Sequence, residues 1–173
     1  SGKRDIGTKR LMEFIINVAP GPLKAPAFLS TEGEELIANA EEPTVVFVFK
    51  SQIEQHIGEI TYFRVIRGKL TEGMELVNSR TGNKEKLSQL FAVAGKNRIK
   101  VTELSAGDIG CTVKLKGTRT NDTLAAAGAH VKVEPIVFPE PRHRAAVKAK
   151  EQGDEEKLGK LLNDLKYEDP TIL

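Results

Sequence analysis

Apolar side chains near the start of the chain recur three and four positions apart, at Leu11, Phe14, Ile15 and Val18. This spacing puts them on one face of a helix, so the pattern predicts a short amphipathic helix that ends by Pro20. Three prolines then fall within residues 19–26. Because proline and the residue before it disfavour a helix, this stretch is predicted to be an extended connector between two domains.

From Thr44 onward the hydrophobic period changes to two residues. Residues 44–50 and 59–66 are rich in β-branched and aromatic side chains and are predicted to be strands. Further strands are predicted at residues 74–78, 84–93, 98–101, 109–115 and 131–137. Residues 27–42 have weak periodicity and are predicted to form a loop. Short strands at close spacing indicate a mainly β fold, for which we predict a closed antiparallel barrel without exposed edges.

The pattern changes again after residue 138. A strand is predicted at residues 144–149, followed by a helix for which Asp154 is the expected N-cap residue. The helix would end before Pro170, and its apolar face is formed by Leu158, Leu161, Leu162 and Leu165. Residues 171–173 resemble the opening of another strand. Because such a strand–helix unit cannot bury its own apolar faces, residues 132–173 are expected to be the first part of an α+β domain.

Composition narrows the class of protein without naming a function. The 173 residues are 39% hydrophobic and 29% charged, with a net charge of +2, which is typical of a folded globular protein. The one cysteine, Cys111, excludes an internal disulfide, and no apolar run approaches the roughly 20 residues of a membrane span. No secretory leader is recognised, so we expect a cytoplasmic location and no membrane partner.

Positive charge is concentrated in one part of the chain. Residues 80–119 contain nine Lys and Arg side chains against three Asp and Glu. Such an excess on a compact domain is expected either of a surface that binds phosphates or of an ordinary solvated face. Cations on turns at one side of a barrel would bind backbone phosphates, which favours recognition of a folded RNA by its shape. The candidate contacts are Arg64, Arg67, Lys69, Arg80, Lys84, Lys86, Lys114, Lys116 and Arg119.

Other kinds of site have little support in the sequence. His56, His130 and His143 lack neighbouring ligands at metal-binding spacing, and Cys111 lies in an apolar strand pattern typical of a core residue. Phe47, Phe49 and Phe63 are likewise expected to be core rather than base-stacking residues. No phosphate-binding loop of the Gly-x-x-x-x-Gly-Lys-Ser/Thr type is present, so the chain itself is predicted to have no catalytic, nucleotide or metal site.

Several motifs together resemble elongation factor G, a translational GTPase. The run at residues 58–70 with Gly73 resembles the start of that family's second domain. The Ala106-Gly107-Asp108-Ile109 turn and residues 115–124 follow in the family's order, with Asn121 where the family often has glycine. Residues 138–141 resemble the entry to the third domain, and residues 168–171 the end of its first helix.

The resemblance implies a division of the chain into three parts. Residues 1–26 would be the last helix and linker of a GTPase domain, residues 27–131 the second-domain barrel, and residues 132–173 the beginning of a ferredoxin-like third domain. Ser1, Gly2 and Lys3 would be either the remnant of a guanine-contact motif or a foreign extension. The parent protein would bind GTP and Mg²⁺. Its second domain would contact small-subunit ribosomal RNA, the GTPase domain and the third domain.

Alternatives remain open at the level of the sequence. Residues 148–153 depart from the family's Pro-Lys pattern, so a diverged second copy of the factor or a ribosomal protection-type GTPase is also considered. A flavin-reductase-like barrel would need a phosphate-binding helix N-terminus, for which the sequence offers no candidate. A third alternative is a barrel that only separates other domains.

Overall fold

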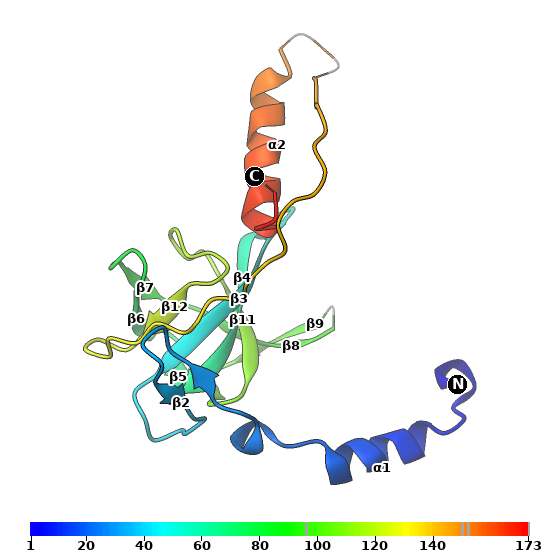
Figure 1. Ribbon diagram of the computed structural model, residues 1–173, viewed down its shortest axis with the longest axis vertical. Helices are drawn as coiled ribbons and strands as arrows, with labels where there is room; N and C mark the ends of the chain where they lie inside the picture. Colours follow the sequence, from blue (N-terminus) through cyan, green and yellow to red (C-terminus); the bar gives the residue numbers. More distant parts are fainter. Residues whose placement is uncertain (96, 150, 152, 173) are drawn as a thin grey trace.

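The computed structural model describes residues 1–95, 97–149, 151 and 153–172. Most of its regular structure is β, with one helix on each side of the β region in the chain (Figure 1). The helices are α1 (Thr8–Val18) and α2 (Glu155–Glu168), and two short 3-10 turns are η1 (Gly2–Arg4) and η2 (Pro22–Lys24). The strands are β1 (Phe28–Leu29), β2 (Glu35–Leu36), β3 (Val45–Glu54), β4 (Gly58–Arg67), β5 (Lys69–Thr71), β6 (Glu75–Asn78), β7 (Lys84–Lys86), β8 (Leu90–Ala94), β9 (Asn97–Val101), β10 (Glu103–Ser105), β11 (Ile109–Val113) and β12 (Thr123–Ala125).

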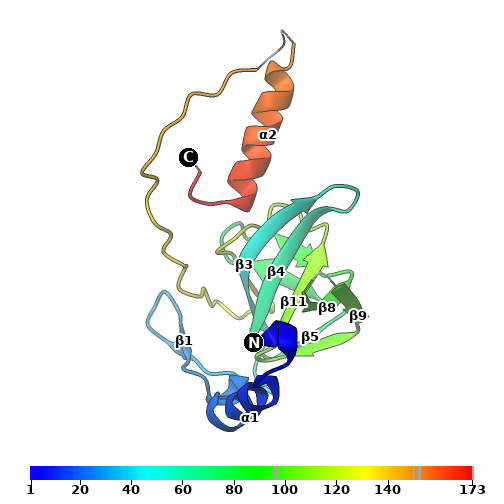
Figure 2. The same cartoon turned by 90° about the vertical axis from the view of Figure 1, so that its right-hand side faces the viewer.

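Eight of these strands form one antiparallel sheet in the order β7-β6-β12-β3-β4-β11-β8-β9. Its centre is the long hairpin of β3 and β4, which Figure 2 shows as the longest ribbon of the molecule. The predicted strands at 44–50 and 59–66 are confirmed, and each extends further toward the hairpin tip because its partner strand satisfies the additional backbone groups.

The sheet does not close into the predicted barrel. No ladder joins β7 to β9 within the described residues, so these two strands are its edges. Beyond β7, Leu87 still exchanges backbone hydrogen bonds with Gly73 and Met74, but the Ser88 N–H then turns back to the Lys86 carbonyl at 3.0 Å, and β8 begins only at Leu90. The prediction of one continuous strand over residues 84–93 was therefore wrong. A separate two-stranded ladder pairs β5 with β10.

Most of the hydrophobic core consists of side chains from the strands of this sheet and from the segments that connect them. A first cluster of buried residues consists of Val46, Val48, Phe63, Val65, Leu70, Leu76, Leu87, Leu90, Leu104, Leu115 and Leu124. A second consists of Leu36, Val45, Phe47, Ile66, Ala125 and Val133. The prediction that the three strand phenylalanines are core residues is confirmed for Phe47 and Phe63, and Phe49 packs half-buried against the second cluster. We refer to residues 28–136, which contain both clusters, as the β-domain.

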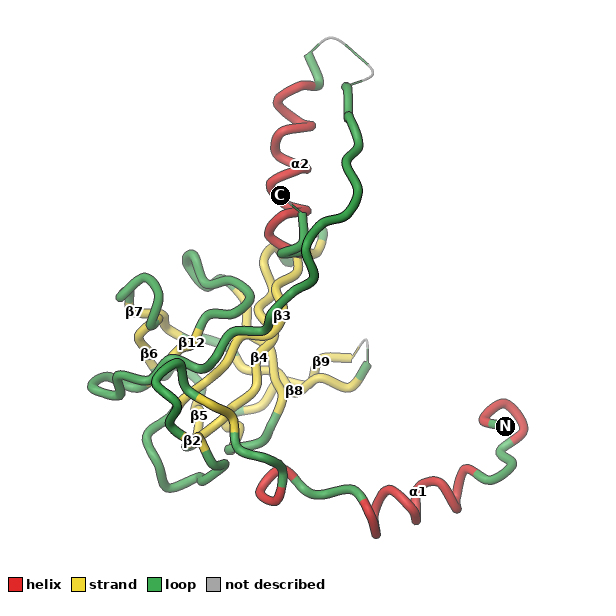
Figure 3. Tube along the Cα trace, in the orientation of Figure 1, coloured by secondary structure: helices red, strands yellow, loops and turns green. Residues whose placement is uncertain are grey.

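The segment before α2 differs from its prediction. Residues 131–137 form no strand and only a single bridge between Val133 and Ser30, because Pro135 has no N–H to donate to a ladder. Residues 144–149, predicted as the strand of an α+β unit, are extended without a partner (Figure 3). A strand needs a neighbour to pair its backbone groups, and none of the described residues provides one.

Both predicted helices are confirmed. Helix α1 ends at Val18 as expected, and none of its residues is buried. Asp154 is the N-cap of α2, but its carboxylate pairs with Lys157 Nζ at 2.6 Å instead of with the helix backbone. The connector after α1 packs against the β-domain at Gly107, where a Cβ would lie 2.3 Å from Pro22 Cβ, so this position requires glycine.

Candidate nucleic-acid interface

Two of the predicted RNA-contacting arginines are occupied by structural roles. Arg67 Nη2 donates to Glu34 Oε1 at 2.9 Å and to the Glu35 carbonyl at 2.8 Å, which holds β2 against β4. Arg80 donates from Nε and Nη2 to the two carboxylate oxygens of Asp122, at 2.6 and 2.8 Å. Because each guanidinium already has a carboxylate that balances its charge, neither side chain is a strong candidate for a phosphate contact.

Four further candidates lie on strands. Arg64 is half-buried and stacks over the Phe28 ring, 5.2 Å from its centroid. Lys84 and Glu75 form an exposed cross-strand pair at 3.0 Å. Lys69 on β5 and Lys86 on β7 are exposed and have no ion-pair partner among the described residues. These four candidates thus lie on three different strands, with Lys84 and Lys86 on the same exposed face of β7.

The remaining three candidates share one loop between β11 and β12, residues 114–121. Lys114, Lys116 and Arg119 are exposed on it, whereas Leu115 and Thr118 are buried. Buried residues thus alternate with exposed cations along the loop. This arrangement fixes the backbone on the β-domain while the charged side chains face solvent.

A polar network, buried except for the Arg80 side chain, anchors this loop to the β6–β7 hairpin, and we call it the Asp122 network. Its members are Asn78, Arg80, Glu85, Thr118 and Asp122. Glu85 accepts hydrogen bonds from the Lys116 backbone N–H at 2.9 Å and from the Thr118 hydroxyl at 3.1 Å. Asp122 Oδ2 accepts from Asn78 Nδ2 at 2.8 Å and from the Arg119 backbone N–H at 3.0 Å. Arg80 also donates to the Gly117 carbonyl at 2.8 Å.

The charge of Asp122 is stabilised inside this network. Burial by itself raises the pKa of the carboxyl, but the hydrogen bonds from Arg80, Asn78 and the Arg119 backbone outweigh it and hold the pKa below its ordinary value. None of the buried side-chain polar atoms in the described residues lacks a hydrogen-bond partner. A fully satisfied network of this kind rigidifies the segment that it joins.

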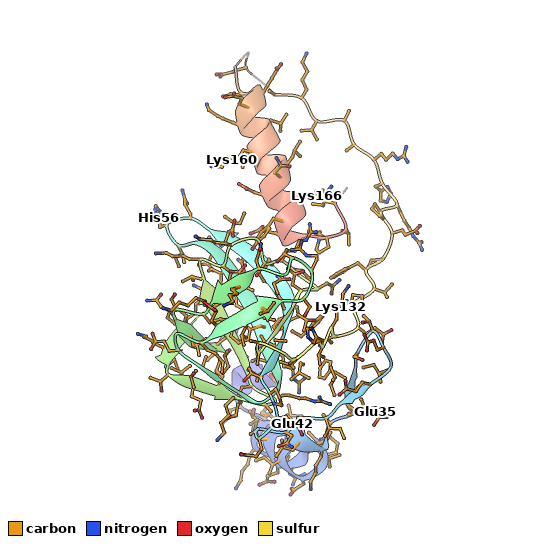
Figure 4. The ribbon with its side chains drawn as sticks, turned by 90° about the vertical axis from the view of Figure 1, so that its left-hand side faces the viewer. Glu35, Glu42, His56, Lys132, Lys160 and Lys166 are labelled. Carbon is orange, nitrogen blue, oxygen red and sulfur yellow. The ribbon has the colours of Figure 1, made fainter. Side chains whose placement is uncertain are left out.

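Two lysines outside the predicted set extend the positive surface beside the loop. Arg119 and Lys166 of α2 line one hollow of about 380 Å³, and Arg119 and Lys132 line a second hollow of about 240 Å³. Figure 4 shows Lys132 and Lys166 on the same side of the molecule. Sequence reasoning missed both because they lie outside the charged stretch of residues 80–119, and only the fold brings them to Arg119.

The structure also describes the possible guanine-motif remnant and the single cysteine. Ser1, Gly2 and Lys3 are exposed, and the Ser1 amino group donates to the Ile6 carbonyl at 2.8 Å. Cys111 is buried, and this burial raises the pKa of its thiol. Within the described residues no group of three His, Cys, Asp or Glu side chains could hold a metal ion. No described helix has the length and apolar character required to cross a membrane.

Comparison with known proteins gives matches to two family models and to solved structures. Residues 43–127 match the model described as elongation factor G domain 2, and residues 138–173 match elongation factor G, domain III. A protein from Thermus thermophilus, whose crystal structure is known, is 27% identical over 99% of this chain, with a TM-score of 0.79. The chain spans 24% of the length of that protein.

Proposed function

Because the chain belongs to the elongation factor G family, of which it carries the second domain and part of the third, we propose that it is the ribosome-contacting portion of a translational GTPase. The parent protein would act in translation elongation, at translocation, and would bind GTP and Mg²⁺ through a domain outside this chain. Its location would be the cytoplasm. The chain itself would bind small-subunit ribosomal RNA and would not be an enzyme.

The observation that carries this proposal is the exposure of three cations on an anchored loop. Lys114, Lys116 and Arg119 face solvent, while the Asp122 network fixes the backbone that holds them. Because the loop is already ordered, binding of phosphates there requires little further loss of conformational entropy. The loop is therefore preferred over the strand candidates, which are dispersed or paired.

The exposed apolar face of α1 favours a neighbouring domain that packs against this helix. Leu11, Phe14 and Ile15 are 57%, 61% and 44% exposed. An amphipathic helix of this kind normally buries its apolar stripe. We therefore propose that residues 1–26 are the last helix and linker of a GTPase domain, which would cover this face. A ribosomal protection-type GTPase would use the same arrangement. No observation favours the flavin-reductase alternative.

Charge reversal at the loop tests the RNA contact. The double variant Lys116→Glu/Arg119→Glu is expected to bind small ribosomal subunits about tenfold or more weakly at moderate salt. The slope of log K against log salt concentration should also become shallower by about 1.5, because two phosphate contacts are lost. Both side chains are exposed and only backbone groups of these residues bond to Glu85 and Asp122, so thermal unfolding should be unchanged.

The matched control carries the same change of charge on strands. Lys69→Glu/Lys86→Glu should bind the subunit within about twofold of the wild-type chain at the same salt concentration. Equal weakening in both double variants would show a general charge effect and would contradict the loop contact. Failure of the wild-type chain to bind the subunit at low salt would contradict the proposed function as a whole.

A further inference from the structure

Helix α2 is attached to the β-domain only through its C-terminal end in the described structure. Tyr167 Oη donates to the Thr118 carbonyl at 3.0 Å, and Glu168 Oε1 accepts from the Ile53 backbone N–H of β3 at 2.5 Å. No residue of the helix is buried, and Leu161 and Leu165 are 59% and 47% exposed. Figure 1 shows the helix standing on the end of the β3–β4 hairpin.

The two hydrogen bonds form what we call the α2 clamp, defined by Tyr167 and Glu168. Burial raises the pKa of the Tyr167 phenol, so its hydroxyl keeps the proton that it donates at neutral pH. The contacts of the helix are mainly polar and none of its side chains is buried, so docking of α2 lacks the apolar burial that usually dominates helix packing. The helix is therefore expected to dock and undock at a lower cost than unfolding of the β-domain.

Thr118 belongs to the α2 clamp and to the Asp122 network at the same time. Its carbonyl accepts from Tyr167, while its hydroxyl donates to Glu85 and accepts from Asn78 Nδ2 at 3.3 Å. The side chain is fully buried. Any displacement of the Thr118 peptide group when Tyr167 leaves must therefore disturb bonds that hold the loop.

The loop and the helix also face each other beside this residue. Arg119 and Thr120 of the loop line the same hollow as Lys166 and Tyr167 of the helix. The Thr120 and Ser51 hydroxyls lie 3.4 Å apart, which joins the loop to β3 next to the Ile53 contact. The docked helix thus closes one side of the loop that carries the candidate RNA contacts.

We propose that the α2 clamp couples docking of α2 to the conformation of the 114–121 loop, with Tyr167 and Glu168 as positioning residues. When α2 is docked, Thr118 stays in place and the loop holds its cations in a fixed position facing solvent. When α2 is undocked, Thr118 and the loop become more mobile. By thermodynamic linkage, a ligand that binds the ordered loop favours the docked helix to the same extent. The coupling itself follows from the contacts, while its consequence for RNA binding rests on the proposed function.

Amide hydrogen exchange of the 173-residue chain tests the coupling without any ligand. The decisive variant is Glu168→Ala, because Glu168 contacts β3 and makes no hydrogen bond to the loop. Loss of an acidic side chain at the C-terminal end of α2 does not weaken the helix through its dipole. We expect the amide of Ile53 to exchange about threefold faster or more, and the amides of Lys116 and Arg119 to exchange faster as well.

Two further variants complete the test. Tyr167→Phe removes the donor to Thr118 and should accelerate exchange at the same three amides, whereas Leu161→Ala on the exposed part of α2 should leave them unchanged. Faster exchange at Ile53 with unchanged Lys116 and Arg119 in Glu168→Ala would overturn the coupling. An unchanged exchange rate of the Ile53 amide in Glu168→Ala would contradict the α2 clamp itself.

The reciprocal measurement uses small-subunit ribosomal RNA freed of its proteins. If the wild-type chain binds this RNA, the Ile53 amide should become more protected, although it lies outside the loop. Binding without added protection at Ile53 would contradict the linkage. Absence of binding would contradict the proposed function instead, and the exchange results on the free variants would still decide the coupling.

Discussion

Gly68→Ala is expected to destabilise the β-domain by about 3 kcal/mol, because two separate penalties coincide at this position. Gly68 has a φ of +75°, a conformation that an L side chain adopts only with strain. An added Cβ would also lie 2.6 Å from Thr44 Cα and 2.7 Å from the Glu42 carbonyl oxygen. Both neighbours are backbone atoms, so they cannot move aside as a side chain would.

Urea unfolding followed by circular dichroism measures this effect. The matched control is Gly73→Ala, since Gly73 has a φ of +82° but no atom within 4 Å of an added Cβ. The control introduces the backbone strain alone, so Gly73→Ala should lower the free energy of unfolding by about 1 kcal/mol. If the two variants unfold at the same urea concentration, the close approach of the 42–44 backbone to Gly68 is not present in solution.

Asp122→Asn is expected to lower the free energy of unfolding by a similar amount, about 3 kcal/mol. Asp122 is only 3% exposed and receives the Arg80 guanidinium, the Asn78 amide and the Arg119 backbone N–H. An asparagine would turn an NH₂ group toward these donors and leave Arg80 without a counter-charge. The control Glu75→Gln removes the partner of exposed Lys84 and should cost less than about 1 kcal/mol.

The pH dependence of the stability of the wild-type chain and of Asp122→Asn gives a second test. The pKa of Asp122 in the folded chain lies below its ordinary value of 3.8. Its contribution is therefore fully present above that value and is lost as the pH falls through the folded pKa. The stability difference between wild type and Asp122→Asn should be constant near neutrality and shrink under strongly acidic conditions. A difference that grows as the pH falls would contradict the assigned sign.

The strong local patterns of the chain were sufficient to predict its hairpin and helices. Residues 44–50 and 59–66 are long runs rich in β-branched and aromatic side chains, and both helices have apolar residues at helical spacing with clear ends. β12 was missed because it has only three residues, Thr123, Leu124 and Ala125, which are too few to show a strand pattern. In residues 131–137 the alternating valines suggested a strand, but only Val133 is buried.

The candidate site shows what charge counting can and cannot provide. The count pointed to a stretch of basic residues, yet it could not separate Arg80 from Arg119. That distinction depends on Asp122, which is 42 positions from Arg80 and meets it only through the fold. Nor could the sequence join Lys132 and Lys166 to the loop. Long-range pairing decides which cations are used for structure and which stay exposed.

Photo-crosslinking from position 116 addresses the proposed RNA contact of the loop without relying on an affinity. A photoreactive side chain replaces Lys116 on the 114–121 loop, and a second variant carries the same group at Lys69 on β5 as the control. With small ribosomal subunits, we expect crosslinks from position 116 to ribosomal RNA and none above background from position 69. Crosslinks from position 116 to ribosomal proteins alone, or an RNA yield equal to that of position 69, would contradict the contact.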